Sequence, residues 1–150
     1  LAARAHGVRV ALTRFGIVLD AHGGALARQL VPFRLGLGGP LGGGRQWVSW
    51  VHAEDAVRLI TLAGTDPSVD GPINVVSPRP VRQRDFARAL GAALHRPAVV
   101  PTPAVALRLA MGEMATLALD GQRVTPSVAL AAGYEFAHPD VDEALRDALR

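Results

Sequence analysis

The sequence contains no cysteine and no lysine, and each absence removes a class of chemistry. Without cysteine the chain has no disulfide, no thiolate nucleophile and no cysteine-based metal site, a composition typical of intracellular proteins. Without lysine it has no phosphate-binding loop lysine, no Schiff-base lysine and no Tyr-x-x-x-Lys pair. We therefore expect a cytoplasmic chain that does not itself supply catalytic groups of these kinds.

Long apolar runs and concentrated charge are also missing. Proline and glycine interrupt every apolar segment before it reaches the ~20 residues that a transmembrane helix needs, and residues 1–10 lack the apolar region of a signal peptide. The net charge of +3 comes from 16 arginines scattered among 13 acidic residues, so no basic stripe predicts nucleic-acid binding. We expect neither a membrane nor a nucleic acid as partner.

The histidine positions and the overall composition bear on metal binding and on the size of the folded core. The five histidines lie far apart in the sequence, without the short spacings of a metal site, so we expect no bound metal. Hydrophobic residues make up 49% of the 150 positions, which is enough for one folded core. The chain does not begin with methionine and starts like the end of a helix, so we expect a fragment of a longer protein.

Residues 1–78 alternate extended and helical patterns. Apolar, β-branched runs predict buried strands at Val8–Thr13, Trp47–Val51 and Pro72–Val76. Periodic apolar positions predict a helix at Ala25–Leu35, with Leu26, Leu30, Val31 and Phe33 inward. A second helix is predicted from Glu54 to Ala63, with Ala56, Leu59, Ile60 and Ala63 inward. This alternation predicts an α/β fold.

Residues 79–150 are predicted to be mainly helical. The helices are expected at Val81–His95, at Val105–Leu119 with a break near Gly112, from Pro126 to Ala132, and at Val141–Leu149 with Asp140 as its cap. Between them, Glu113 is expected to pair with Arg123. We interpret this half as a substrate cap or an interaction domain and leave a homodimer open.

The stretch Arg34–Asp55, RLGLGGPLGGGRQWVSWVHAED, combines a glycine-rich segment, two tryptophans and the start of a helix. Its six glycines do not suit a helix or a strand interior, so they predict a loop that lies close to something or moves. A glycine loop anchored on a buried strand often forms one wall of a ligand site. We expect such a wall here.

Three runs carry a family resemblance: VRVALTRFGIVLDAHGGAL, LGGPLGGGRQWVSWVHAEDAVRLI and GPINVVSPRPVRQRDFARALGAALHRPA. They resemble the C-terminal half of NAD(P)-dependent epimerase/dehydratase proteins, which are extended short-chain dehydrogenases/reductases. The tail, PAVALRLAMGEMATLALDGQRVTPSVALAAGYEF, resembles a small C-terminal domain of unknown function in one subgroup of that family.

The resemblance implies the C-terminal part of a Rossmann-like parallel sheet, followed by a mainly helical C-terminal domain. It also implies a cofactor, NAD or NADP, bound by the full-length protein. In the family, the glycine fingerprint and the catalytic Tyr-x-x-x-Lys precede the strand that matches Val8–Thr13, and residues 36–44 do not fit G-x-G-x-x-G in any register. We therefore expect this chain alone to be inactive and not to bind a dinucleotide tightly.

Two departures from the family pattern concern the substrate. Sugar-nucleotide members carry an asparagine where this chain has Ile17 and an arginine where it has Val48, both for the substrate diphosphate. Burying phosphate oxygens against apolar side chains is costly. Arg45 is a substitute that the loop could offer, but we expect a small carbonyl or alcohol rather than a sugar nucleotide.

The resemblance also places three residues beside the cofactor. These are Arg14, Phe15 and Gly16, which match the segment that packs next to the nicotinamide. The alternative for Arg14 is an ion pair between the strand and a helix. The alternative for Gly16 is an ordinary turn glycine.

Three residues near the end of the glycine-rich stretch are candidates for binding the substrate: Gln46, Trp50 and His52. Alternation along one strand would put Gln46 and Trp50 on the same face. The alternatives are a core position for Trp50 and a structural hydrogen bond for His52.

Two functions from different classes remain open at this point. In the first, the full-length protein is an NAD(P)-dependent epimerase or oxidoreductase, and this chain is its substrate-side part. In the second, it is a non-catalytic module that senses NAD(P) or binds another protein, because fold resemblance alone does not establish catalysis.

Overall fold

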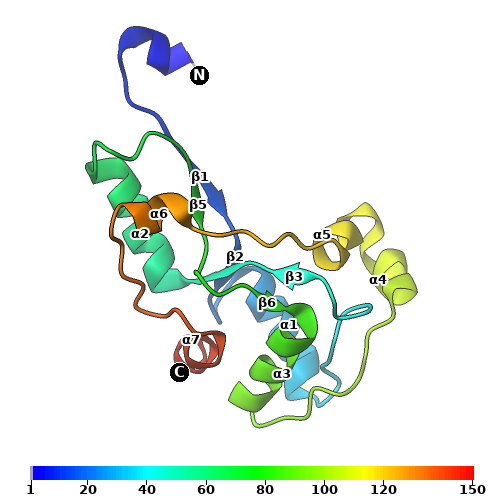
Figure 1. Ribbon diagram of the computed structural model, residues 1–150. Helices are drawn as coiled ribbons and strands as arrows, with labels where there is room; N and C mark the ends of the chain where they lie inside the picture. The colour runs from blue at the N-terminus through cyan, green and yellow to red at the C-terminus, as the bar shows by residue number, and fades with distance from the viewer. Residues whose placement is uncertain (1) are drawn as a thin grey trace.

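The structure is a computed structural model that describes residues 2–150. A short 3₁₀ helix, η1 (Ala2–His6), precedes strand β1 (Ala11–Phe15), which pairs in parallel with β5 (Gly71–Val75). Strand β2 (Ile17–Leu19) pairs in parallel with β4 (Trp50–His52). The α/β class with parallel strands is confirmed (Figure 1).

Gly16 is the point at which the chain changes strand partner. Its amide donates to Val75 O at 3.1 Å, while the next amide, of Ile17, donates to Ser49 O at 2.8 Å. A Cβ on Gly16 would overlap the Ser49 carbonyl. Only glycine therefore fits this crossing.

The predicted strand Trp47–Val51 is in fact two strands. β3 (Trp47–Val48) pairs antiparallel with β6 (Val81–Arg82), whereas β4 pairs with β2. Ser49 lies between them. Trp50 packs with Val48 in one core and Val51 packs in another, so neighbouring residues face opposite sides as predicted. Both are fully buried because β4 is covered on both faces.

One apolar core joins both halves of the chain. Side chains from β2, from β3 and β4, and from helices α1 (Gly24–Arg34), α3 (Gln83–Ala93) and α7 (Val141–Ala148) pack together in it. Of the residues predicted to face inward on α1, Val31 is instead 62% exposed. It lies about 100° around the helix from its buried neighbour Leu30, which turns it away from the core. The division of the chain at residue 78 stays a prediction.

A second core lies on the other side, around helix α2 (Ala53–Thr65). Ala56 and Leu59 of α2 pack there with Val51, Val75 and Ala129, and Ala129 belongs to helix α6 (Ser127–Ala131). Ile60 was predicted to face inward but is 46% exposed, because the buried stripe of α2 runs through Leu59 and Ala63.

The predicted break in the long apolar run at 105–119 is confirmed. Helix α4 (Ala104–Met111) ends at Gly112, whose φ of 59° is left-handed, and a 3₁₀ turn, η2 (Gly112–Met114), leads into α5 (Ala115–Leu119). Residues 121–125 follow in extended form without joining a sheet. No helix among the described residues is long and apolar enough to cross a membrane.

The glycine-rich segment 36–44 lies close to a second segment of the chain. A Cβ on Gly38 would overlap the ring of Phe33, and one on Gly39 would overlap the backbone of Val100. The amide of Val100 donates to Gly38 O at 3.1 Å, and Thr102 donates to Pro40 O at 2.9 Å. Of the two predicted roles, close approach or movement, these contacts support close approach for Gly38 and Gly39.

Candidate functional site

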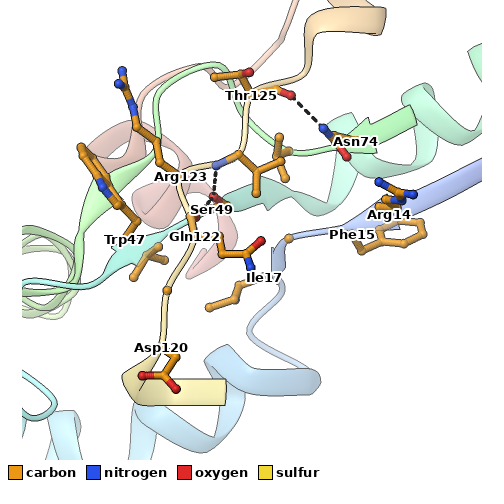
Figure 2. A pocket seen from close by; sticks show the side chains of 15 residues that line it. Arg14, Phe15, Ile17, Trp47, Ser49, Asn74, Asp120, Gln122, Arg123 and Thr125 are labelled. Carbon is orange, nitrogen blue, oxygen red and sulfur yellow. Dashed lines mark hydrogen bonds between the residues drawn. The ribbon is translucent and has the colours of Figure 1, made fainter. Parts of the chain in front are cut away.

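A cavity with a volume of about 820 Å³ lies at the carboxyl ends of β1 and β5. Three parts of the chain line it: residues 14–17, residues 47–49 with Asn74 and Val76, and residues 120–125 (Figure 2). Open α/β sheets bind their ligands outside the carboxyl ends of parallel strands. No residue of the glycine-rich segment 36–44 lines this pocket, so the predicted wall is not part of it.

The residues predicted to lie beside a cofactor, Arg14, Phe15 and Gly16, form one side of the pocket. Phe15 is 49% exposed, and Gly16 adds backbone without a side chain. Arg14 is exposed and makes no ion pair within residues 2–150, so the ion-pair alternative finds no support.

The base of the pocket is apolar. Ile17 and Val48 line it together with Val76. Ile17 and Val48 are the two positions at which sugar-nucleotide epimerases are expected to carry phosphate-binding side chains. Because both line the pocket, the departure in the sequence becomes a single apolar feature of it, where neither side chain can donate to a diphosphate.

The opposite side of the pocket is built around Trp47, not Trp50. Trp47 is half-buried, and the guanidinium of Arg82 lies 3.8 Å from its ring centroid. Arg123 lies 5.2 Å from the same centroid. Trp50 is 0% exposed, and its indole N–H donates to Arg79 O at 3.1 Å. The alternative of a core position thus describes Trp50.

The other two candidates for substrate binding also lie outside the pocket. The Gln46 amide donates to Leu41 O at 3.0 Å, on the side of the glycine-rich segment. His52 is buried at the start of α2, where its Nδ1 accepts a hydrogen bond from Glu54 N at 3.2 Å. The three predicted residues therefore do not line the pocket, whereas Trp47, Ser49 and Asn74, which were not predicted, do.

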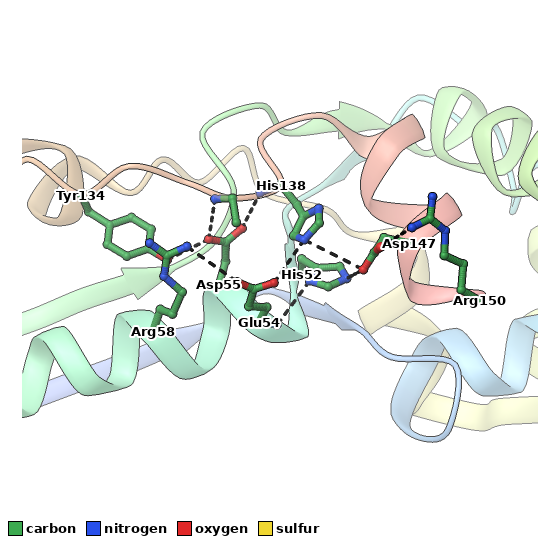
Figure 3. Close-up of polar contacts among 9 residues, drawn as sticks. His52, Glu54, Asp55, Arg58, Tyr134, His138, Asp147 and Arg150 are labelled. Atoms are coloured by element: carbon green, nitrogen blue, oxygen red, sulfur yellow. Dashed lines mark hydrogen bonds and ion pairs between the residues drawn. The ribbon is translucent and has the colours of Figure 1, made fainter.

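A separate polar cluster surrounds the start of α2 (Figure 3). Asp55 is 0% exposed and accepts three hydrogen bonds: from Tyr134 Oη at 2.7 Å, and from Ala137 N and His138 N at 2.9 Å each. Burial, with the hydrogen bond to Asp55 next in weight, raises the pKa of Tyr134. Tyr134 therefore stays neutral and donates its hydroxyl hydrogen to Asp55.

Two histidines of this cluster lie close together although they are far apart in the sequence. The rings of His52 and His138 are 3.9 Å apart between centroids, and one ligand-type atom each of His52, His138 and Asp147 lies within 4.8 Å of the others. Because Nδ1 of His52 accepts a hydrogen bond, the neutral ring carries its proton on Nε2, 3.5 Å from Asp147 Oδ2. A metal at Nε2 of His52 would need the lone pair of this protonated nitrogen, whereas the buried Nδ1 of His138 has no hydrogen-bond partner among the described residues.

The electrostatics of His52 follow from its surroundings. Burial lowers the pKa of His52, and the neighbouring His138 lowers the same pKa further, while Asp147 opposes both effects. His52 is therefore held in the neutral form that caps the helix.

Comparison with known proteins identifies sequences that are similar to this chain. A family model described as a domain of unknown function (DUF1731) matches residues 102–148. The chain is 48% identical over 139 residues to the chloroplastic homolog of Epimerase family protein SDR39U1 from Arabidopsis thaliana, covering 93% of this chain and 40% of that protein. It is 44% identical over 140 residues to Epimerase family protein SDR39U1 from Mus musculus, covering 93% and 48%. The chain thus spans about half the length of the curated relatives that it matches.

Solved structures agree with the sequence relatives. The crystal structure of human epimerase family protein SDR39U1 (isoform 2) with NADPH matches with a TM-score of 0.91 and 39% identity, over 95% of this chain and 49% of that chain. A nucleoside-diphosphate sugar epimerase from Corynebacterium glutamicum matches with a TM-score of 0.76 and 29% identity, over 98% and 27%.

Proposed function

The chain is related in sequence and fold to the epimerase family proteins, and on this premise we propose that it is the substrate-side part of an NAD(P)-dependent epimerase or oxidoreductase. The substrate is a small carbonyl or alcohol compound. The cofactor fingerprint and the catalytic tyrosine and lysine belong to sequence outside these 150 residues.

The observation that carries this proposal is the position of the pocket. It opens at the carboxyl ends of two parallel strands, where α/β folds place ligands. The half-exposed ring of Phe15 and the bare backbone of Gly16 together offer a flat surface that fits a nicotinamide ring. The NADPH in the human relative's crystal structure makes NADP(H) the first cofactor to test.

In this proposal the cofactor supplies hydride transfer, and the residues of this chain position the reactants. Phe15 and Gly16 hold one face of the nicotinamide, and Arg14 lies at the edge of that site. Ile17 and Val48 present an apolar surface to the substrate and exclude water from the reacting carbon. Trp47 forms the far wall.

The test uses the full-length protein encoded by the gene. NADPH, NADP, NADH and NAD are compared by thermal shift, and NADPH consumption is followed with a panel of small aldehydes and ketones. Phe15→Ala should weaken NADPH binding about tenfold, corresponding to about 1.4 kcal/mol of lost apolar contact. Leu130→Ala removes a comparably exposed apolar side chain from α6, outside the pocket, and should leave NADPH binding unchanged.

The outcomes separate the candidate functions. Cofactor binding with turnover supports the enzyme. Cofactor binding without turnover of any carbonyl compound supports the alternative, a module that senses NAD(P) or binds another protein. Absence of binding to all four nucleotides would overturn the proposal.

A further inference from the structure

We propose that Arg123, in the domain of unknown function, binds a carboxylate group of the substrate, so that this domain selects which compounds enter the pocket. The inference rests on the proposed function and names the substrate class: planar, singly charged carboxylates that carry a carbonyl or alcohol group. It also gives the segment matched by DUF1731 a role in recognition.

The segment 120–125 is held against the sheet at three points. The Ser49 hydroxyl donates to Gln122 O at 2.8 Å and accepts from Val124 N at 3.0 Å. The Asn74 side chain donates to Thr125 O at 3.1 Å. A Cβ on Gly121 would overlap the Trp47 carbonyl, so the segment approaches β3 as closely as backbone allows. A fixed backbone gives Arg123 a defined position at the pocket.

Arg123 has no anionic partner within residues 2–150. The expected ion pair with Glu113 is wrong: both side chains are exposed, and neither makes an ion pair in the described part of the chain. The described neighbour of the Arg123 guanidinium is the indole of Trp47, 5.2 Å from it. A guanidinium beside a pocket, with its N–H groups free of carboxylates, is well suited to bind an anion from solution.

Trp47 adds a planar surface next to this cation. Arg82 covers its ring at 3.8 Å, and Arg82 is itself held by a hydrogen bond from Nη1 to Arg45 O. The second arginine fixes the indole and adds positive potential to the same wall. A planar substrate that lies along Trp47 can direct a carboxylate to Arg123.

The middle of the pocket disfavours a second anionic group near Arg123. Ile17 and Val48 offer no donors to such a group, and Asp120 repels it. The other cation of the lining, Arg14, lies at the opposite end beside the proposed nicotinamide site. Figure 2 shows Arg123 and Trp47 on the side of the pocket opposite Arg14 and Phe15. A carboxylate at Arg123 therefore leaves the other end of the substrate free to face the proposed nicotinamide site.

The experiment compares two aldehydes of the same shape, benzaldehyde and a carboxybenzaldehyde, with full-length protein and NADPH. The measured quantity is the ratio of their kcat/KM values. Arg123→Ala should reduce the preference for the charged aldehyde ten- to a hundredfold, as expected for a lost charge-assisted pair. Arg123→Lys should restore part of it, because it keeps the charge but not the planar fork. Arg108→Ala, on α4 in the same domain and outside the pocket, should leave the ratio unchanged.

A binding measurement tests the same role of Arg123 if the protein turns over neither aldehyde. Benzoate is titrated into the full-length protein and followed by NMR, at low and high salt, for the wild type and the same three variants. Weaker binding in Arg123→Ala but not in Arg108→Ala supports the inference. An unchanged kcat/KM ratio, or equal benzoate affinity in wild type and Arg123→Ala, overturns it. Failure of the proposed function looks different, because NADPH then fails to bind while benzoate still does.

Discussion

At the scale of single residues, Asp55 is more than the helix-terminal carboxylate that the sequence predicts. It lies in the first turn of α2, where negative charge is favourable, but its oxygens are fully buried and bind the chain at residues 134–138. One side chain therefore joins α2 to a segment some eighty residues later. No local pattern reveals such a partner, because the donors are two backbone amides and one hydroxyl.

Asp55→Ala is expected to lower the free energy of unfolding by about 3 kcal/mol, because it leaves the partly buried amides of Ala137 and His138 without their acceptor. Tyr134→Phe removes one of the three hydrogen bonds and should cost about 1 kcal/mol. Urea denaturation of each variant measures both values. Glu135→Ala, an exposed position on the same segment, is the control, and a loss in Asp55→Ala no larger than in this control would contradict the interpretation.

His52 is expected to make stability depend on pH. Its pKa in the fold is lowered from 6.5 by burial and then by His138, so folding favours the neutral ring. The stabilisation is complete above pH 6.5, which is the unfolded value, and is lost as the pH falls below 6.5 toward the lower folded pKa. Protonation also removes the Nδ1 lone pair that caps α2.

Thermal melts between about pH 8 and about pH 5.5 measure this effect in the window where histidine titrates. His52→Asn keeps a capping acceptor without a titrating ring, so its melting temperature should fall less over this window than that of the wild type. Glu54, Asp55, His138 and Asp147 also face the ring and are present in both proteins. His22→Asn, at an exposed position, should keep the wild-type profile, and parallel profiles for wild type and His52→Asn would refute the assignment.

At the scale of elements, sequence patterns located most helices and strands but not the pairing of the strands. The cap at Asp140 was predicted correctly because capping is local: its carboxylate accepts from Asp142 N at 3.0 Å. The strand at 47–51 was predicted as one piece because its residue types are uniformly β-favouring. Its division at Ser49 depends on two different partner strands, β6 and β2, which no local pattern specifies.

The contact between β3 and the segment 120–125 is expected to depend on Gly121. Gly121→Ala places a methyl group against the Trp47 carbonyl and should destabilise the contact by about 1–3 kcal/mol, the usual cost of overpacking. Limited trypsin digestion followed by mass spectrometry should then show faster cleavage after Arg123. Gly64→Ala in α2 meets no atom within 4 Å and serves as the control. Equal cleavage rates after Arg123 in the two variants would show that the segment is not held at this point.

At the scale of the whole molecule, the pocket could be predicted only in part. Residues 14–16, which the resemblance places beside the cofactor, line its edge at the end of β1, where ligands of such sheets bind, and their contact with a cofactor stays a prediction. The opposite wall combines Trp47 with residues 120–125, more than seventy positions later. Its composition follows from the tertiary path of the tail, and choosing between Trp47 and Trp50 required knowledge of which strand each one joins.

The exposure of strand β1 leads to the last prediction. Four of its five residues are exposed, among them Leu12 at 37% on one face and Phe15 at 49% on the other, and Val57 of α2 adds another exposed apolar side chain at 64%. Parallel strands are normally covered on both faces and paired on both edges, whereas β1 pairs with β5 alone among the described strands. We therefore expect residues 1–150, expressed alone, to associate or to precipitate as the concentration rises.

Light scattering across a concentration series measures this association. Leu12→Glu, which places a charge on the exposed face, should reduce it, whereas Leu109→Glu, on the exposed side of α4, should not. A monodisperse monomer with a cooperative thermal transition would contradict the expectation, because it would mean that two-stranded parallel pairing with one uncovered face suffices for this fold. If only Leu12→Glu restores a monomer, the face of β1 is the surface that other protein normally covers, and the pocket at its carboxyl end is then completed by that same protein.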